Sequence, residues 1–162
     1  MKSLLVFGVS AAMSLLASAV IAWLYVWPWL KKRELGSALQ SLVAPHVFLR
    51  FIGLSFLIPG VVSPGLPAAF ANPAAFGDLI AGVLAIVSII SLAKGAPWRI
   101  PVAWLFNIWG AADFLFAFYQ GPRLGMPPES LGAGFFIPTA IVPPLLVTHF
   151  LMLRLLTQRK RG

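Results

Sequence analysis

Cysteine is absent from this 162-residue chain, and charged residues make up only 10% of it. The lack of cysteine excludes a disulfide framework, a thiol nucleophile and a cysteine-based metal site. Soluble domains usually carry charge on about a quarter of their residues, so an ordinary soluble domain is excluded as well. Only four residues are acidic. They form no cluster in the sequence, which argues against a hard-metal site for phosphoryl transfer, and we predict no metal ligands.

The signatures of several enzyme classes are also missing. The chain contains no Gly-x-Ser-x-Gly, no His-Glu-x-x-His and no phosphate-binding loop. Lysine is absent from the interior of every apolar segment, which excludes a retinal pigment. These absences favour a protein that is not an enzyme, although they leave enzymatic activity open.

Long apolar runs are what the chain has in abundance, since 60% of its residues are hydrophobic. A helix of about 20 apolar residues crosses the hydrocarbon core of a bilayer. The sequence therefore predicts an all-α fold, a five-helix integral membrane bundle formed as one domain by residues 1–162. The predicted spans are about 3–30, 42–58, 73–93, 100–119 and 132–156. The first run continues well past the small residues Ala17-Ser18-Ala19, so we expect an uncleaved span and not a signal peptide.

Basic residues gather at alternate ends of these spans, and the bias predicts an orientation. An outside N-terminus leaves only Lys2 and Arg123 outside the cell. The predicted cytoplasmic set is Lys31, Lys32, Arg33, Lys94, Arg99, Arg159, Lys160 and Arg161. This asymmetry is typical of a multi-pass protein of a bacterial-type cytoplasmic (inner) membrane with its C-terminus in the cytoplasm. We interpret the net charge of +8 as contact with lipid headgroups and not with nucleic acid.

Prolines set the expected helix boundaries. Asn72-Pro73 is a typical helix start, which would place Asp78 in the second turn, close to the outer face. The uncharged segment 59–71 before it contains three prolines, so we expect it to lie in the interface or fold back over the bundle end. In the fifth span, Pro138, Pro143 and Pro144 each free a backbone carbonyl that needs another partner.

Helical spacing predicts which faces of the spans turn inward. On the fourth span, the face with Ala103, Phe106, Gly110, Asp113, Ala117 and Gln120 is small and polar, and the opposite face carries Leu105, Ile108, Ala112, Leu115 and Tyr119. On the second span the inward face is His46, Arg50, Gly53 and Leu57, and on the fifth it is Thr139, Val142, Leu146 and His149. Charged side chains facing lipid cost several kcal/mol, so the polar faces should meet inside the bundle.

Six polar residues within the spans are therefore the candidate ligand-binding residues: His46, Arg50, Asp78, Asn107, Asp113 and His149. Three hypotheses compete for them. The structural one pairs Arg50 with Asp113 and lets Asn107 and His149 bond carbonyls freed by proline. The second is a binding site for a lipid or another apolar or amphiphilic molecule, and it includes haem b with His46 and His149 as axial ligands. The third makes Asp113 the titrating group of a membrane-embedded enzyme or a proton-coupled carrier.

Two membrane families share features with the chain. The run from Phe106-Asn107 to Ala112-Asp113 resembles the Phe-Asn…Ala-Asp run of lipoprotein signal peptidases, which also need a second aspartate nearby and an Asn-x-Gly-Ala-Ala-Phe stretch. That stretch is absent here, and we expect Asp78 near the opposite depth. The size and tryptophan content are similar to those of the translocator-protein family, but its span patterns do not occur in order. We therefore transfer no residue roles from either family.

The sequence thus favours a non-enzymatic membrane protein. We expect it to bind an apolar or amphiphilic small molecule, or to dock on a partner membrane protein or a second copy of itself.

Overall fold

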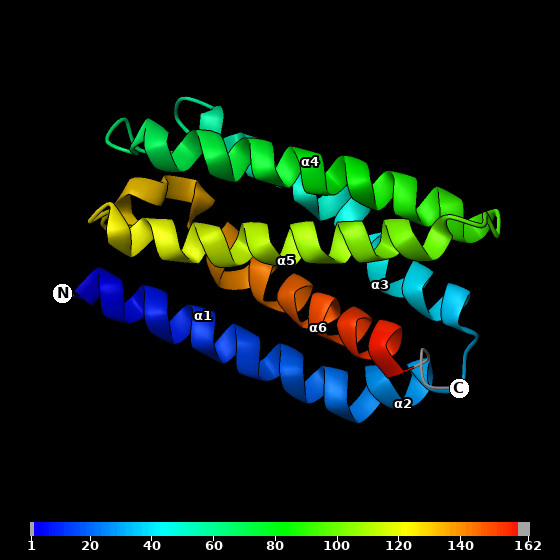
Figure 1. The fold of residues 1–162 in the computed structure, drawn as a ribbon. Coiled ribbons are helices and arrows are strands. Elements are labelled where there is room, and N and C mark those ends of the chain that lie inside the picture. Colours follow the sequence, from blue (N-terminus) through cyan, green and yellow to red (C-terminus); the bar gives the residue numbers. More distant parts are fainter. Residues whose placement is uncertain (1, 159–162) are drawn as a thin grey trace.

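The computed structural model describes residues 2–158, and this part of the chain is helical without named strands (Figure 1). It contains five helices long and apolar enough to cross a membrane, as predicted: Lys2–Leu30, Leu35–Leu57, Ala68–Ala93, Arg99–Arg123 and Ile137–Gln158. The first consists of α1 (Lys2–Ile21), the π-helical η1 (Ala22–Val26) and α2 (Trp27–Leu30). Arg159, Lys160 and Arg161, which belong to the predicted cytoplasmic set, lie outside the described residues.

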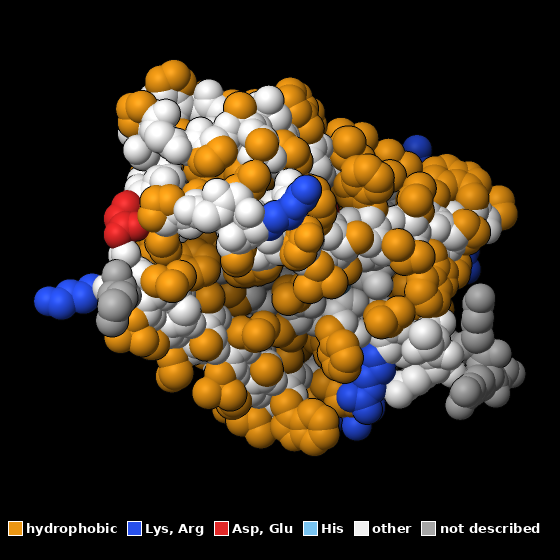
Figure 2. All heavy atoms as spheres, turned by 60° about the vertical axis from the view of Figure 1, so that its left-hand side comes forward, with side chains coloured by type: hydrophobic (Ala, Val, Ile, Leu, Met, Phe, Trp, Pro, Cys, Tyr) orange, Lys and Arg blue, Asp and Glu red, His pale blue; other side chains and the backbone are white. Residues whose placement is uncertain are grey.

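The surface of the bundle is largely apolar. Figure 2 shows hydrophobic side chains over most of one face, with a few scattered charged groups. Large side chains such as Phe48, Ile108 and Tyr119 are more than half exposed. Outward-facing apolar side chains of this kind are typical of helices that contact lipid.

Helix α4 (Ala68–Ala93) packs against α5 (Arg99–Arg123) and against both halves of the second span. Helix α1 lies at the edge of the bundle, against α6 (Val142–Gln158), and buries none of its residues. Its less exposed positions include Ser10, Ser14 and Ser18, whereas Gly8 is exposed, and a methyl group added there would have no neighbour within 4 Å. Helix α1 is therefore held by a stripe of small residues with weak burial, whereas the rest of the first span buries Ala22, Trp27 and Leu30.

The third span begins earlier than the sequence predicts. Helix α4 starts at Ala68, and the Pro67 carbonyl accepts the backbone N–H groups of Phe70 and Ala71. Asn72-Pro73 is therefore inside the helix and not at its start. The segment before it is hydrogen-bonded to η3 (Pro128–Phe135), because Ser63 N donates to Ser130 O.

The earlier start corrects the depth of Asp78. This residue lies ten positions after the start of α4, and Asp113 lies ten positions before the end of α5 at Arg123. The two helices run antiparallel (Figure 1), so both aspartates lie roughly 15 Å from the same end of the bundle. The expectation that Asp78 sits near the opposite depth is wrong.

The second span changes its helix type at Arg50. Helix α3 (Leu35–Leu49) is α-helical, and η2 (Arg50–Leu57) is a 3₁₀ helix with three residues per turn. Its buried residues are Arg50, Gly53 and Phe56, at a spacing of three. Leu57 is 37% exposed, so it does not belong to the inward face as expected from α-helical spacing.

The fourth span has the predicted faces, because Leu105, Ile108, Ala112, Leu115 and Tyr119 are all exposed. The fifth span starts at Ile137 and not at residue 132. Gly132 has a left-handed backbone with φ of 52°, which breaks the helix there. Pro138 lies in the π-helical η4 (Ile137–Ile141), where the Thr139 hydroxyl donates to Phe135 O at 2.7 Å.

Candidate functional site

One guanidinium joins the second, third and fourth spans. Nη1 of Arg50 lies 2.7 Å from Oδ1 of Asp78 and 2.7 Å from Oδ2 of Asp113. The arginine is 1% exposed, and each aspartate side chain is at most 10% exposed. The sequence predicts the pair with Asp113, and the structure adds Asp78 as an equal partner. A buried arginine that makes charge-assisted hydrogen bonds to two carboxylates holds three helices to one another.

The other end of the same guanidinium reaches the fourth and fifth spans. Nη2 of Arg50 donates to Gly110 O at 2.6 Å and lies 3.0 Å from Nε2 of His149. Nδ1 of His149 lies 2.9 Å from Oδ1 of Asn107. Arginine can only donate, so Nε2 of His149 accepts, and Nδ1 carries the proton that is donated to Asn107. His149 is therefore a neutral imidazole in this arrangement.

His46 completes the cluster from the second span. Its ring centroid is 4.5 Å from that of His149, and its Nε2 is 2.7 Å from the Thr148 hydroxyl. Because Thr148 donates its own proton to Leu145 O, the His46 nitrogen must donate. Nδ1 of His46 is buried and has no hydrogen-bond partner among the described residues.

The structure brings all six predicted site residues into one connected cluster. Asn107 and His149 bond each other, however, and not the carbonyls freed by proline as the structural hypothesis expects. The arrangement does not fit haem either. Axial histidines must lie on opposite faces of the macrocycle, whereas the rings of His46 and His149 are in direct contact. Among residues 2–158, no group of three or more histidine, aspartate or glutamate residues is placed to hold a metal ion.

Three glycines let the helix backbones close around these charges. A Cβ at Gly53 would overlap the Asp78 carboxyl group, and one at Gly77 would overlap that of Asp113. At Gly110 it would lie 2.6 Å from the His149 ring and 2.7 Å from Nη2 of Arg50. Every larger residue at these positions therefore collides with the polar cluster.

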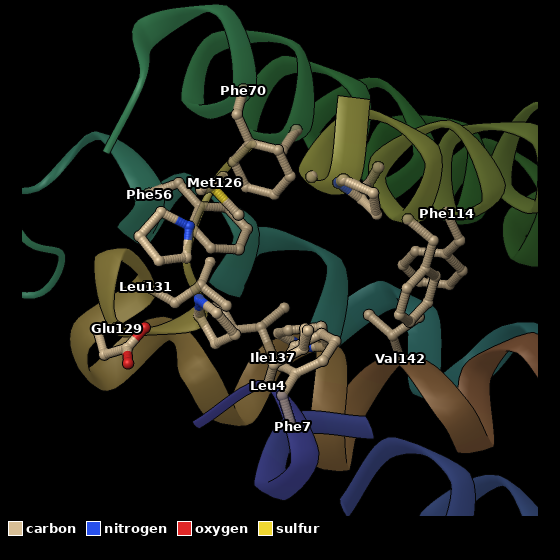
Figure 3. A pocket seen from close by; sticks show the side chains of 18 of the residues that line it. Leu4, Phe7, Phe56, Phe70, Phe114, Met126, Glu129, Leu131, Ile137 and Val142 are labelled. Carbon is tan, nitrogen blue, oxygen red and sulfur yellow. The ribbon is translucent and has the colours of Figure 1, made fainter. Parts of the chain in front are cut away.

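A cavity of about 550 Å³ adjoins the two aspartates. Figure 3 shows its aromatic and aliphatic walls, which come from several helices. Its phenylalanines are Phe7, Phe56, Phe70, Phe114 and Phe118, and we call it the phenylalanine cavity. Asp78, Asp113 and Glu129 also line it. A hydrogen bond with the Ser3 side chain lowers the pKa of Glu129, so this exposed carboxylate stays ionised at neutral pH.

A second cavity of about 620 Å³ lies on the other side of the cluster, between α1, α5 and α6. Asn107 and His149 line it together with Trp23, Trp27 and Arg154. The guanidinium of Arg154 stacks over the ring of Trp27 at 4.0 Å. The hydrogen-bonded series Asp113, Arg50, His149 and Asn107 thus connects the two cavities.

Residues 6–157 match a family model described as "Domain of unknown function (DUF8737)". The chain belongs to the DUF8737 family. No curated protein and no solved structure matches it significantly. The match extends over all five long helices of the bundle.

Sequence reasoning missed several residues of the site in this DUF8737 protein. Phe114, whose ring lies 3.5 Å from the Arg50 guanidinium, looks like an ordinary lipid-facing residue in the sequence. Thr148 and Gly77 carry no signal of their own. A glycine one position before an aspartate in an apolar run, as in Gly77-Asp78, is the one pattern that could have drawn attention to close helix packing.

Proposed function

We propose that this protein is a non-enzymatic, multi-pass protein of the cytoplasmic membrane that binds an amphiphilic small molecule in the phenylalanine cavity. The supporting observation is the cavity itself, which combines phenylalanine walls with the carboxylates of Asp78 and Asp113. Ligand sites are typically concave and apolar, with a few polar groups that orient the ligand. An apolar body would contact the phenylalanine rings, and a polar head would contact the carboxylates.

Filling the cavity tests this proposal. Ala117 lines the cavity on α5, and Ala112 on the same helix is exposed on the opposite, lipid-facing side. Ala117→Trp is expected to weaken binding of the neutral fluorescent probe N-phenyl-1-naphthylamine at least tenfold, because the indole occupies the ligand's space. Ala112→Trp is the matched control and should leave affinity unchanged. Titrations in nanodiscs, with empty nanodiscs subtracted, measure both; equal affinities in the two variants would reject the cavity as the binding site.

The proposed orientation places the N-terminus outside and the C-terminus in the cytoplasm. The described basic turns at Lys31–Arg33 and at Lys94–Arg99 lie at the end of the bundle opposite the N-terminus (Figure 1), which supports this assignment. Reporter fusions at Glu34, Ser63, Gly95 and Glu129 are expected to report inside, outside, inside and outside. A cytoplasmic reporter that is active at Ser63 would contradict the five-span orientation.

A proton-coupled carrier that uses Asp113 is the second candidate. The observation that favours it is the connected series of polar groups between the two cavities, with Asp113 at one end and Asn107 at the other. A carrier needs groups that change their charge or their partners inside the membrane; in this role Asp113 would take up and release the proton, and Arg50 would exchange its partners. The Asp113→Asn variant described in the Discussion separates this role from a structural one.

A further inference from the structure

We infer that the phenylalanine cavity selects a ligand whose head group is a cation, such as an amphiphilic amine or quaternary ammonium compound. This inference rests on the proposed binding function and specifies the class of ligand. Its basis is the charge of the groups that line the cavity, the aromatic character of its walls and the position of Arg50.

Charge is distributed very unevenly around this cavity. The chain has twelve lysine and arginine residues and only four acidic ones. Three of those four, Asp78, Asp113 and Glu129, line the phenylalanine cavity, and none of its lining residues is a lysine or an arginine. The fourth acidic residue, Glu34, is exposed in the turn before α3. A strongly basic protein thus has one cavity whose charged lining groups are all acidic.

Arg50 does not cancel this negative charge. One guanidinium faces two carboxylates, so the ionised cluster carries a net charge of −1. His149 adds no positive charge, because its Nε2 accepts from Arg50. In the described part of the chain, the hydrogen bonds of both aspartates go to Nη1 of Arg50, and the second oxygen of each carboxylate, which packs against Gly53 or Gly77, has no other donor. The arginine side chain is fully buried behind the carboxylates and is not among the lining residues.

The walls suit a cation as well. The faces of aromatic rings attract cations, and quaternary ammonium groups are commonly bound by several rings together. Phe114 already contacts one cation, since the Arg50 guanidinium lies 3.5 Å from its ring centroid. The other phenylalanines named above line the same cavity as the two carboxylates, and Figure 3 shows Phe7, Phe56 and Phe70 among its walls. An anionic head group would instead be placed next to carboxylates in an apolar environment, where like charges repel strongly.

A pair of probes of matched shape tests the inference. 4-Phenylbutyl-trimethylammonium and 4-phenylbutane-sulfonate share an arylalkyl body and differ in the sign of the head group. Each would be titrated against bound N-phenyl-1-naphthylamine in nanodiscs of zwitterionic lipid. The cation is expected to displace the neutral probe at a concentration at least about tenfold lower than the anion, which corresponds to a difference of about 1.4 kcal/mol.

Three charge-neutralising variants assign the effect to the cavity. Asp113→Asn should weaken binding of the cation about tenfold more than it weakens binding of the neutral probe. Glu129→Gln removes an exposed carboxylate, so the variant protein should fold normally. This variant should weaken cation binding about threefold. Glu34→Gln changes the net charge of the protein by the same amount away from the cavity, and it should have no effect.

The outcomes distinguish the two proposals. If the neutral probe binds and is displaced equally by both ions, or better by the sulfonate, the cation inference is wrong and the cavity remains a binding site. If Glu129→Gln and Glu34→Gln have the same effect, the preference comes from overall charge, and the inference is again overturned. If the neutral probe does not bind, or if Ala117→Trp leaves its binding unchanged, the proposed function fails and the inference fails with it.

Discussion

Replacing Arg50 with glutamine is expected to lower the free energy of unfolding by roughly 3–5 kcal/mol, because it leaves buried carboxylates without a cation. Two carboxylates lose their partner at once, since Asp78 and Asp113 share one nitrogen atom of this side chain. Gly110 O and His149 also lose a donor. Thermal unfolding in detergent, followed by the loss of soluble protein on heating, measures the change.

The two aspartate variants should behave differently from the arginine variant. Asp113→Asn leaves Arg50 paired with Asp78, and Asp78→Asn leaves it paired with Asp113, so each is expected to cost clearly less than Arg50→Gln. The triple variant with all three changes has no buried charge in this cluster and should recover part of the stability lost by Arg50→Gln. Additive losses across the series would show that the three side chains do not interact.

The same series tests whether Asp113 acts chemically. If its role is structural, binding or transport by Asp113→Asn should decline in proportion to its stability. If Asp113 carries a proton for a carrier, function should be abolished at temperatures where this variant is folded. Binding of the neutral probe provides the check that the cavity is intact under those conditions.

Gly110→Ala is expected to have the second largest effect. The added methyl group would lie 2.6 Å from the His149 ring and 2.7 Å from Nη2 of Arg50, which is closer than non-bonded atoms approach. Both neighbours are buried and hydrogen-bonded, so neither moves without breaking a bond. Overpacking of this kind typically costs about 1–3 kcal/mol. The measurement is again the unfolding temperature in detergent.

Gly8→Ala is the matched control for this substitution. Gly8 also lies within a helix, but nothing is within 4 Å of the position of the added methyl group. Alanine has the higher helix propensity, by about 1 kcal/mol, so this variant should be as stable as the original or slightly more stable. A Gly110→Ala protein as stable as the Gly8→Ala protein would show that the backbone of α5 is not held against the polar cluster.

Much of the architecture follows from composition and spacing. Five apolar runs predict the five helices, and the spacing of polar residues on the fourth run correctly predicts its buried and exposed faces. The six predicted site residues meet because the apolar side chains around them offer polar groups no other partners. These inferences depend on the polarity and spacing of the residues, which the sequence shows directly.

The errors concern local geometry. Asn72-Pro73 has the chemistry of a helix start, yet the helix begins just after Pro67, and the segment before it is held by hydrogen bonds of Val61 and Ser63 to residues far along the chain. The change to a 3₁₀ helix at Arg50 was not predictable, because residues at spacings of three and four both suit the apolar run. The shared guanidinium could not be foreseen, since it depends on how three helices are placed against one another.

The 3₁₀ segment also affects how far the second span reaches. A 3₁₀ helix rises about 2.0 Å per residue and an α-helix about 1.5 Å, so the eight residues of η2 extend about 4 Å further than they would as an α-helix. The guanidinium thereby stays level with the two carboxylates while the chain still reaches the far end of the bundle. Each residue of η2 also turns the chain by about 120°. Deleting one residue between Arg50 and Phe56 would shorten the span by about 2 Å and point the Phe56 ring away from the phenylalanine cavity.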